Sequence, residues 1–231
     1  MGSLKFKYRF KNKETAFNYV VEIDDQTLGL MDKTGSDEVP EWVNLEYNKC
    51  PNCPLNETIT PHCPVAKSID TLCRTVKSSH SYDVYKTTVV SPFRIYYSEV
   101  DFQTGLKSLF GLIMPTCGCP HTSFLRPLTR FHLPFDDFES VLHRALGNYL
   151  IGRLLDPEVA ENDVASLEDL KMYYKNISIV NKTMAARIEK YKENYEPDKN
   201  ALVILDSFTQ LMEIEWETNF ESISYLYKKQ A

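Results

Sequence analysis

The stretch KFKYRF, at residues 5–10, alternates charged and apolar residues, which predicts a β-strand with one buried face. FNYVVEID follows after a polar turn, and TLGLM is a third, shorter candidate strand. Further along, YDVYKTTVV and FRIYYSEVDF are rich in β-branched and aromatic residues and are split by Ser91–Pro92, so they predict two adjacent antiparallel strands. We therefore expect one antiparallel, meander-like sheet of about four or five strands in residues 1–102.

The second half of the chain has the apolar spacing that is typical of helices. We expect a buried helix over residues 103–114 that Pro115 ends. Asp136 or Asp137 can cap a further helix that runs to Leu155. Two more helices are expected: one opened by Ser166 and Asp169, which resemble a capping box, and one over residues 198–228.

The order of these elements predicts an α+β fold, with the helices packed together and against one face of the sheet. We expect a single domain over residues 1–231, in which residues 1–102 are mainly β and residues 103–231 are mainly α. The β part also contains a Cys-Pro-rich loop and a short helix over residues 66–76. That helix would place four residues on its buried face, namely Ile69, Leu72, Cys73 and Val76.

Charge and composition narrow the classes of function. A net charge of −6 argues against a protein whose main role is to bind nucleic acid through its phosphates. The chain has no run of about 18 apolar residues, so we expect no membrane span. The start, MGSLKFKYRFKNKE, lacks the apolar stretch of a secretory signal, and we therefore expect a cytoplasmic protein with reduced or metal-bound cysteines. The glycosylation sequons at Asn56, Asn176 and Asn181 are then expected to be coincidental.

Proline follows four of the six cysteines: Cys50, Cys53, Cys63 and Cys119. Proline fixes the backbone and keeps these turns out of helices, so that each sulfur projects from a rigid loop. The first two cysteines have the C-x2-C spacing that presents two thiolates to one ion, and four thiolates complete a closed, structural zinc site. Cys117 and His121 are substitutes for the fourth ligand, whereas Cys73 is expected in the core.

Two other interpretations of the same cysteines stay open. Cysteine followed by proline also occurs at iron–sulfur clusters, and soft thiolate ligands do not by themselves separate zinc from iron. The third interpretation is a proline-stiffened loop with reduced cysteines and no metal. Visible absorption distinguishes a cluster from zinc.

The loop SFLRPLTRFHLPFDD, at residues 123–137, contains a second constellation. Arg126, Arg130 and His132 precede a helix N-terminus and are candidates for binding a phosphate or carboxylate. In the alternative interpretation the arginines pair with local acids such as Asp136, and His132 anchors the loop through hydrogen bonds.

The segments CPNCPL…CPVA, GLIMPTCGCP and RPLTRFHLPF together resemble an uncharacterised bacterial protein family, a domain of unknown function that would cover nearly the whole chain. The resemblance implies that Cys50, Cys53, Cys63 and Cys119 are the motif cysteines and that Arg130, His132 and Pro134 belong to the loop motif. The family pattern has serine where this chain has Cys117, which makes Cys117 the less favoured ligand. No activity transfers with the resemblance.

The chain has no complete catalytic triad, P-loop, dinucleotide fingerprint or HExxH helix. We therefore expect a non-catalytic binding or regulatory protein, stabilised by the four-cysteine site, whose partner is an unknown protein or a small anionic ligand. The alternative is an iron–sulfur redox or sensor protein, or an enzyme that acts on an anionic substrate at the Arg126, Arg130 and His132 loop. The sequence leaves the oligomeric state open.

Overall fold

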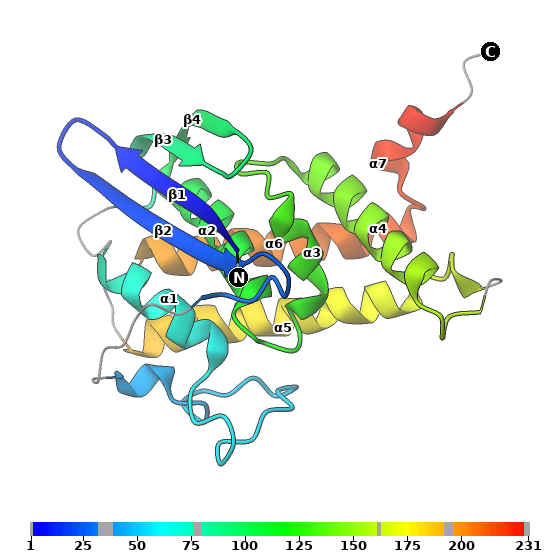
Figure 1. Cartoon of the computed structure of the whole chain (residues 1–231), viewed down its shortest axis with the longest axis horizontal. Coiled ribbons are helices and arrows are strands. Elements are labelled where there is room, and N and C mark those ends of the chain that lie inside the picture. The colour runs from blue at the N-terminus through cyan, green and yellow to red at the C-terminus, as the bar shows by residue number, and fades with distance from the viewer. Residues whose placement is uncertain (1, 32–38, 76–79, 161–162, 192–195, 229–231) are drawn as a thin grey trace.

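The structure, a computed structural model, has the expected α+β architecture, with an N-terminal sheet followed by a helical region (Figure 1). It describes residues 2–31, 39–75, 80–160, 163–191 and 196–228. Four antiparallel strands form the sheet in the order β2-β1-β3-β4. Their bounds are β1 (Ser3–Lys11), β2 (Ala16–Asp24), β3 (Val84–Val90) and β4 (Ile95–Asp101).

The sheet consists of two hairpins joined along their inner strands, so the expected meander is wrong. β1 and β3 pair directly, with Tyr8 opposite Val89. TLGLM, which the structure describes in full, forms no strand, and Leu30 makes one isolated bridge with Ile23. Leu28 has a φ of 55°, which turns the chain out of the extended conformation at this point.

The inner face of β1 supplies much of the core. Leu4, Phe6, Tyr8 and Phe10 are buried and alternate with exposed residues, as the KFKYRF pattern predicts. These side chains face α2 (Phe102–Thr116), and the ring of Phe10 packs edge-on against that of Phe102. Helix α2 comes so close here that a Cβ at Gly105 would lie 2.5 Å from Cε1 of Phe10.

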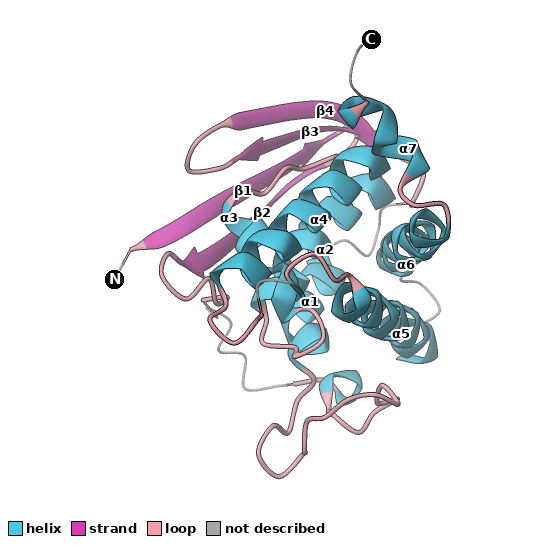
Figure 2. Cartoon of the chain, turned by 90° about the vertical axis from the view of Figure 1, so that its right-hand side faces the viewer, coloured by secondary structure: helices cyan, strands magenta, loops and turns pink. Residues whose placement is uncertain are grey.

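The helices lie on one face of the sheet (Figure 2). Helix α2 contacts the sheet and α6, and α5 packs along α6. The other helices are α1 (Pro64–Thr75), α3 (Arg126–Arg130), α4 (Phe138–Leu155), α5 (Glu168–Tyr191), α6 (Glu196–Glu217) and α7 (Glu221–Ser224). Single 3-10 turns are η1 (Glu41–Val43), η2 (Ser123–Leu125) and η4 (Tyr225–Tyr227).

Local signals predict several helix ends. Asp137 caps α4, where its Oδ1 accepts a hydrogen bond of 2.8 Å from the Ser140 N–H. Pro115, by contrast, lies inside the last turn of α2 and does not end the helix before it. The hydroxyl of Thr116 donates back to the carbonyl oxygens of Leu112 and Ile113, at 3.1 and 2.9 Å, which closes this turn after the proline.

Two other helix predictions need correction. α5 begins at Glu168, two residues after Ser166, and Asp169 forms an ion pair of 2.9 Å with Arg153. The helix expected over residues 198–228 is interrupted, because Asn219 and Phe220 have φ values of 54° and 58°. The N–H of Phe220 donates to the carbonyl of Glu215 at 2.8 Å, which terminates α6.

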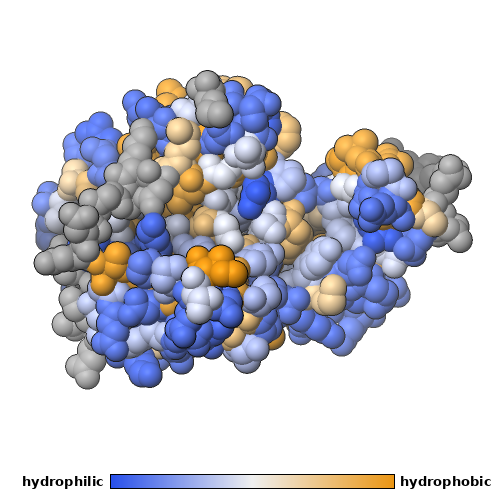
Figure 3. Space-filling model, turned by 60° about the horizontal axis from the view of Figure 1, so that its bottom comes forward, coloured by the Kyte–Doolittle hydropathy of each residue, from blue (hydrophilic) through white to orange (hydrophobic). Residues whose placement is uncertain are grey.

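The short helix before β3 forms as expected. Ile69, Leu72 and Cys73 on α1 are buried, whereas Val76 lies outside the described residues. The face of the molecule in Figure 3 is mostly hydrophilic, with hydrophobic residues in small groups. In the part of the chain that the structure describes, no helix has the length and apolar character to span a membrane.

Gly105 and Gly111 offer a matched test of packing within α2. Gly105→Ala should lower the free energy of unfolding by about 1–3 kcal/mol, because the new methyl group meets the buried ring of Phe10. Gly111→Ala is the control: its Cβ would meet no atom within 4 Å, so higher helix propensity should raise stability by about 1 kcal/mol. Urea unfolding of both variants measures the difference, and equal effects would contradict the close approach of α2 and β1.

Candidate functional site

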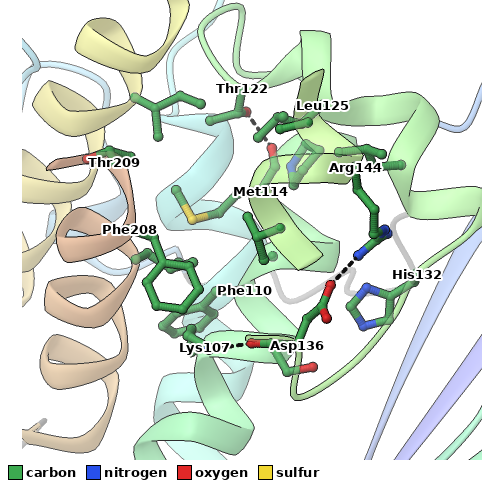
Figure 4. Close-up of a pocket in the computed structure, with 18 of the residues that line it drawn as sticks. Lys107, Phe110, Met114, Thr122, Leu125, His132, Asp136, Arg144, Phe208 and Thr209 are labelled. Carbon is green, nitrogen blue, oxygen red and sulfur yellow. Dashed lines mark hydrogen bonds and ion pairs between the residues drawn. The ribbon is translucent and has the colours of Figure 1, made fainter. Parts of the chain in front are cut away.

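A cavity of about 170 Å³ lies where α2, α4, α5 and α6 meet residues 122–136 (Figure 4). Its walls are mainly apolar, and the side chains that define them include Phe110, Met114, Leu125, Ile177, Leu205 and Phe208. Each of these helices contributes one face to the cavity because each carries apolar residues at helical spacing. The cavity is therefore a product of the helical layer as a whole.

One polar side chain in the cavity wall lacks a partner. Asn181 on α5 is 1% exposed, and neither Oδ1 nor Nδ2 of its amide has a hydrogen-bond partner in the structure. The neighbouring hydroxyl groups differ, because Thr122 donates to the carbonyl of Met114 and Thr209 to that of Asp206, both at 2.6 Å. Buried amides are normally hydrogen-bonded, so Asn181 is the exceptional group of this cavity.

The charged groups of the cavity wall already interact with the protein. Arg144 donates to Oδ2 of Asp136 at 2.9 Å and to the carbonyl of Phe131 at 3.0 Å. Lys107 donates to the carbonyl of Asp136, and its Nζ lies 4.3 Å from the ring centroid of Phe208. Burial lowers the pKa of Lys107, whereas the charge of Asp136 opposes this shift. Figure 4 shows both contacts of Asp136 at the same end of the cavity.

His132 is half-buried, lines both the cavity and a surface hollow, and forms part of a chain of hydrogen bonds that leads into the core. Its Nε2 is bonded to the hydroxyl of Tyr8, which lies 2.9 Å from Oγ of Ser108. Burial, and then the charge of Arg144, lowers the pKa of His132 to about 3, so the imidazole is neutral at pH 7. Each of these hydrogen bonds has one donor and one acceptor when Ser108 donates to Tyr8 and Tyr8 donates to His132. The two bonds link α2, β1 and the loop that contains His132.

The two candidate arginines lie on a short helix, α3, and not on an extended segment. Arg126 donates from Nε to the carbonyl of Pro115, and Arg130 donates to the carbonyl of Asp25, both at 3.4 Å. Asp136 pairs with Arg144 instead. Arg130 and His132 line one surface hollow together with Arg94, which the sequence analysis missed, and Arg126 is not in its wall. The anion site stays a prediction, and a neutral His132 would add no charge to it.

The cysteine loops lie side by side. The N–H of Cys53 donates to the carbonyl of Cys50 at 3.0 Å, which closes the C-P-x-C turn. Nε2 of His121 is bonded to the carbonyl of Asn52 at 2.7 Å, and this contact joins the loop of Cys119 to that turn. Cys63 precedes α1, where its carbonyl accepts the N–H of Lys67.

Electrostatic interactions also connect the four predicted cysteines. Burial is the main cause that raises the pKa of Cys50 to about 11, and the charges of Cys63, Cys119 and Cys53 make smaller contributions in the same direction. Burial likewise raises the pKa of Cys119, with a contribution from Cys63. All of these cysteines are free thiols.

No three His, Cys, Asp or Glu side chains are arranged as ligands of one metal ion among the residues that the structure describes. The zinc or iron–sulfur site therefore stays a prediction. The two other cysteines have separate environments: Cys117 donates from Sγ to the carbonyl of Met114 at 3.1 Å, and Cys73 is in the core, as expected.

Arg187 positions the segment that leads into the first cysteine loop, and the sequence analysis did not identify this residue. Arg187 on α5 is 1% exposed and donates to four backbone carbonyls at 2.9–3.4 Å, those of Trp42, Asn44, Leu45 and Asn48. Its helical spacing places it beside Met184 and Ile188 on the apolar stripe, and Asn181 lies on the same stripe. A polar residue within an apolar stripe was the signal that could have identified both.

The fold and the site define an α+β protein in which four helices line a small, mainly apolar, partly open cavity, and in which the loops of Cys50, Cys53 and Cys119 lie side by side at a separate place. The chain belongs to the family described as "Domain of unknown function (DUF6901)", whose model matches residues 4–228. This match confirms the resemblance to an uncharacterised family over nearly the whole chain. Comparisons with curated proteins and with solved structures gave no match.

Arg187 should contribute strongly to stability. We expect Arg187→Met to lower the free energy of unfolding by about 3 kcal/mol or more, because four buried carbonyls lose a charged donor. Urea unfolding followed by circular dichroism measures this change. Lys175→Met removes an exposed cation from the same helix and should change stability by less than about 0.5 kcal/mol. Similar effects of the two substitutions would contradict the role of Arg187.

The predicted zinc site has a separate test. If Cys50, Cys53, Cys63 and Cys119 bind zinc, metal analysis should find about one zinc ion per chain, and a strong chelator should lower the melting temperature, because binding energy is folding energy. Cys50→Ser and Cys119→Ser should then lower the zinc content and the melting temperature together. Cys117→Ser is the control, which should change neither.

Visible absorption of anaerobically purified protein would indicate an iron–sulfur cluster instead. Zinc-containing protein whose melting temperature does not respond to the chelator would contradict a structural role of the metal. Protein that lacks metal after purification in the presence of zinc would contradict the site itself.

Proposed function

We propose that the protein is a non-catalytic binding protein that holds a small, mainly apolar molecule in the cavity between α2, α4, α5 and α6. The observation that carries this proposal is the wall of the cavity, which is mainly apolar and includes Phe110, Ile177 and Leu205. Sites for small molecules are typically concave and mainly apolar, with a small number of polar groups in their walls.

Gly111 lies on the solvent-exposed side of the cavity. It is in the middle of α2 and lines the cavity, and a Cβ at this position would meet no atom within 4 Å. A glycine inside a helix is less favourable than alanine by about 1 kcal/mol, and neither a positive φ nor a close approach requires it here. A larger side chain at this position would therefore probe the open side of the cavity.

The state of the titratable groups favours binding over catalysis. His132 is neutral and bonded to Tyr8, and Arg144 is paired with Asp136. A general acid or base at pH 7 needs a pKa near that pH, which His132 lacks. An enzyme that acts on an anionic substrate at the Arg126, Arg130 and His132 loop is therefore the less supported alternative.

The cysteine loop has a separate place in this proposal. A structural zinc ion at Cys50, Cys53, Cys63 and Cys119 would stabilise the loop beside α5, at a different place from the cavity. The redox or sensor alternative depends on an iron–sulfur cluster at the same cysteines, and it would be supported by visible absorption and not by ligand binding.

Binding of toluene tests the proposal. We expect wild-type protein to bind this probe, with chemical-shift changes in Met114, Ile177 and Leu205 and a higher melting temperature. The gain in stability should be about 1.4 kcal/mol when free toluene is ten times its Kd. Gly111→Leu adds a side chain at a solvent-exposed position of the cavity wall and should weaken binding. Gly152→Leu is the matched control, because it adds the same side chain at an exposed position of α4 that is not part of the cavity wall. Wild-type protein that does not bind toluene, or equal binding by Gly111→Leu, would refute the proposal.

A further inference from the structure

A second hollow, on the surface, contains two arginines, and no acidic residue is among the described residues of its wall. Arg94 comes from the turn between β3 and β4, and Arg130 comes from the end of α3. Most of the other residues that line this arginine hollow are aromatic, namely Phe6, Phe93, Tyr96 and Phe131. It is a separate site from the cavity between the helices, although His132 lines both.

The turn that carries Arg94 has a backbone fixed by hydrogen bonds. The N–H of Ser91 donates to the carbonyl of Arg94, and Oγ of Ser91 accepts the N–H of Arg94, both at 2.9 Å. Arg94 is exposed, and no acidic partner of its guanidinium is among the contacts of the residues that the structure describes. The hairpin therefore presents an unpaired cation at the wall of the arginine hollow.

Arg130 is half-buried, and its charge is not compensated either. The hydrogen bond that it forms with the backbone carbonyl of Asp25 is long, at 3.4 Å. Asp136, a local acid that the sequence offers as a partner, forms its ion pair with Arg144 instead. Within the described part of the chain Arg94 and Arg130 form no ion pair, so two positive charges share one hollow.

Two exposed phenyl rings line the same hollow. Phe93 is 63% exposed and Phe131 is 70% exposed. The backbone of Phe131 is held in place, because Arg144 donates to its carbonyl at 3.0 Å and the next residue, His132, is bonded to Tyr8. A single exposed apolar residue needs no explanation, but two aromatic rings beside two cations form a surface that matches an aromatic anion.

The two arginines favour a phosphate group over a carboxylate. A guanidinium binds either group through two parallel hydrogen bonds. A carboxylate has two oxygens and a single negative charge, so it would balance the charge of only one arginine. A phosphate monoester has three acceptor oxygens and a charge of about −1.5 to −2 at pH 7, which balances both.

We infer that the arginine hollow binds an aryl phosphate monoester, with the phosphate held by Arg94 and Arg130 and the aromatic ring packed against Phe93 and Phe131. This inference goes beyond the proposed function, because it concerns a different site and does not depend on a ligand in the cavity. A free aryl phosphate and a phosphotyrosine side chain share this chemistry.

Phenyl phosphate, methyl phosphate and benzoate are the probes, because they separate the phosphate from the ring. Titration calorimetry at low salt should show that wild-type protein binds phenyl phosphate about fivefold more tightly than either of the others. Arg94→Gln and Arg130→Gln should each weaken binding of phenyl phosphate about tenfold. Arg126→Gln is the matched control: it removes a cation of the same short helix that is not in the wall of the hollow, and it should keep binding.

Phe131→Ala tests the contact with the ring. It should reduce the preference for phenyl phosphate over methyl phosphate and leave binding of methyl phosphate unchanged, and the exposure of this side chain makes loss of the fold unexpected. Gly111→Leu, which alters the cavity between the helices, should not change binding of phenyl phosphate. This inference and the proposed function therefore fail or hold separately.

Four results would overturn the inference. Wild-type protein that does not bind phenyl phosphate refutes the site, and an equal loss of binding in Arg126→Gln refutes its location. Tighter binding of benzoate than of phenyl phosphate refutes the phosphate group. Equal binding of phenyl phosphate and methyl phosphate refutes the aromatic part of the ligand.

Two measurements on wild-type protein complete the test. The Nε–H NMR signals of Arg94 and Arg130 should shift on addition of phenyl phosphate, and unchanged signals would refute the contact without any need for variants. A phosphotyrosine peptide distinguishes the two sources of the group: tighter binding than that of phenyl phosphate assigns it to a protein partner, and weaker binding assigns it to a free small molecule.

Discussion

The buried guanidinium of Arg187 is the interaction that joins the irregular segment of residues 42–48 to the helical layer. It has four backbone carbonyls as partners, and no acidic side chain is among the partners that the structure describes for it. Residues 39–63 contain one 3-10 turn as their only helix, and their internal backbone hydrogen bonds belong to turns and to one isolated bridge between Asn44 and His62. The fork of the arginine donates to several carbonyls at once, and this fixes the loop relative to α5. Trp42, from the same loop, then donates to Asp70 at 3.0 Å and thereby orients α1.

One buried stripe of residues on α5 therefore contacts two regions of the molecule. Arg187, near its C-terminal end, holds residues 42–48, and Asn181, six residues earlier, lines the cavity. Between the helices, Ser178 donates to Asp206 on α6 at 2.7 Å. The polar residues of the stripe differ in their hydrogen bonds: Ser178 and two nitrogens of Arg187 have partners, whereas Nε of Arg187 and both polar atoms of Asn181 have none among the residues that the structure describes.

The sequence predicted the elements that local physics decides. Alternation of charged and apolar residues predicted β1, and apolar residues at helical spacing predicted α4 and α5. Asp137 could be predicted as the cap of α4 because its hydrogen-bond partner, Ser140, is only three residues away. The direct pairing of β1 with β3 was missed, because it depends on contacts between residues about 80 positions apart.

The site was harder to predict for the same reason. The partners of His132 and Arg187 are 124 and up to 145 positions away, and no local pattern specifies them. The cysteine motif predicted a metal site that stays a prediction, although the contact of His121 with the carbonyl of Asn52 brings two of its loops together. The cavity is lined by residues of four helices and left no continuous motif.

The neutral state of His132 links folding to proton uptake. Its pKa is about 3 in the folded protein and about 6.5 in an unfolded chain. Above pH 6.5 both states have a neutral imidazole, so this residue makes no contribution to pH dependence. As the pH falls below 6.5, the unfolded chain binds a proton that the folded protein refuses, and stability decreases by up to about 1.4 kcal/mol per pH unit until the folded pKa is reached. Because its hydrogen bond to the core residue Tyr8 requires a neutral imidazole, His132 makes the folded state less stable in acid.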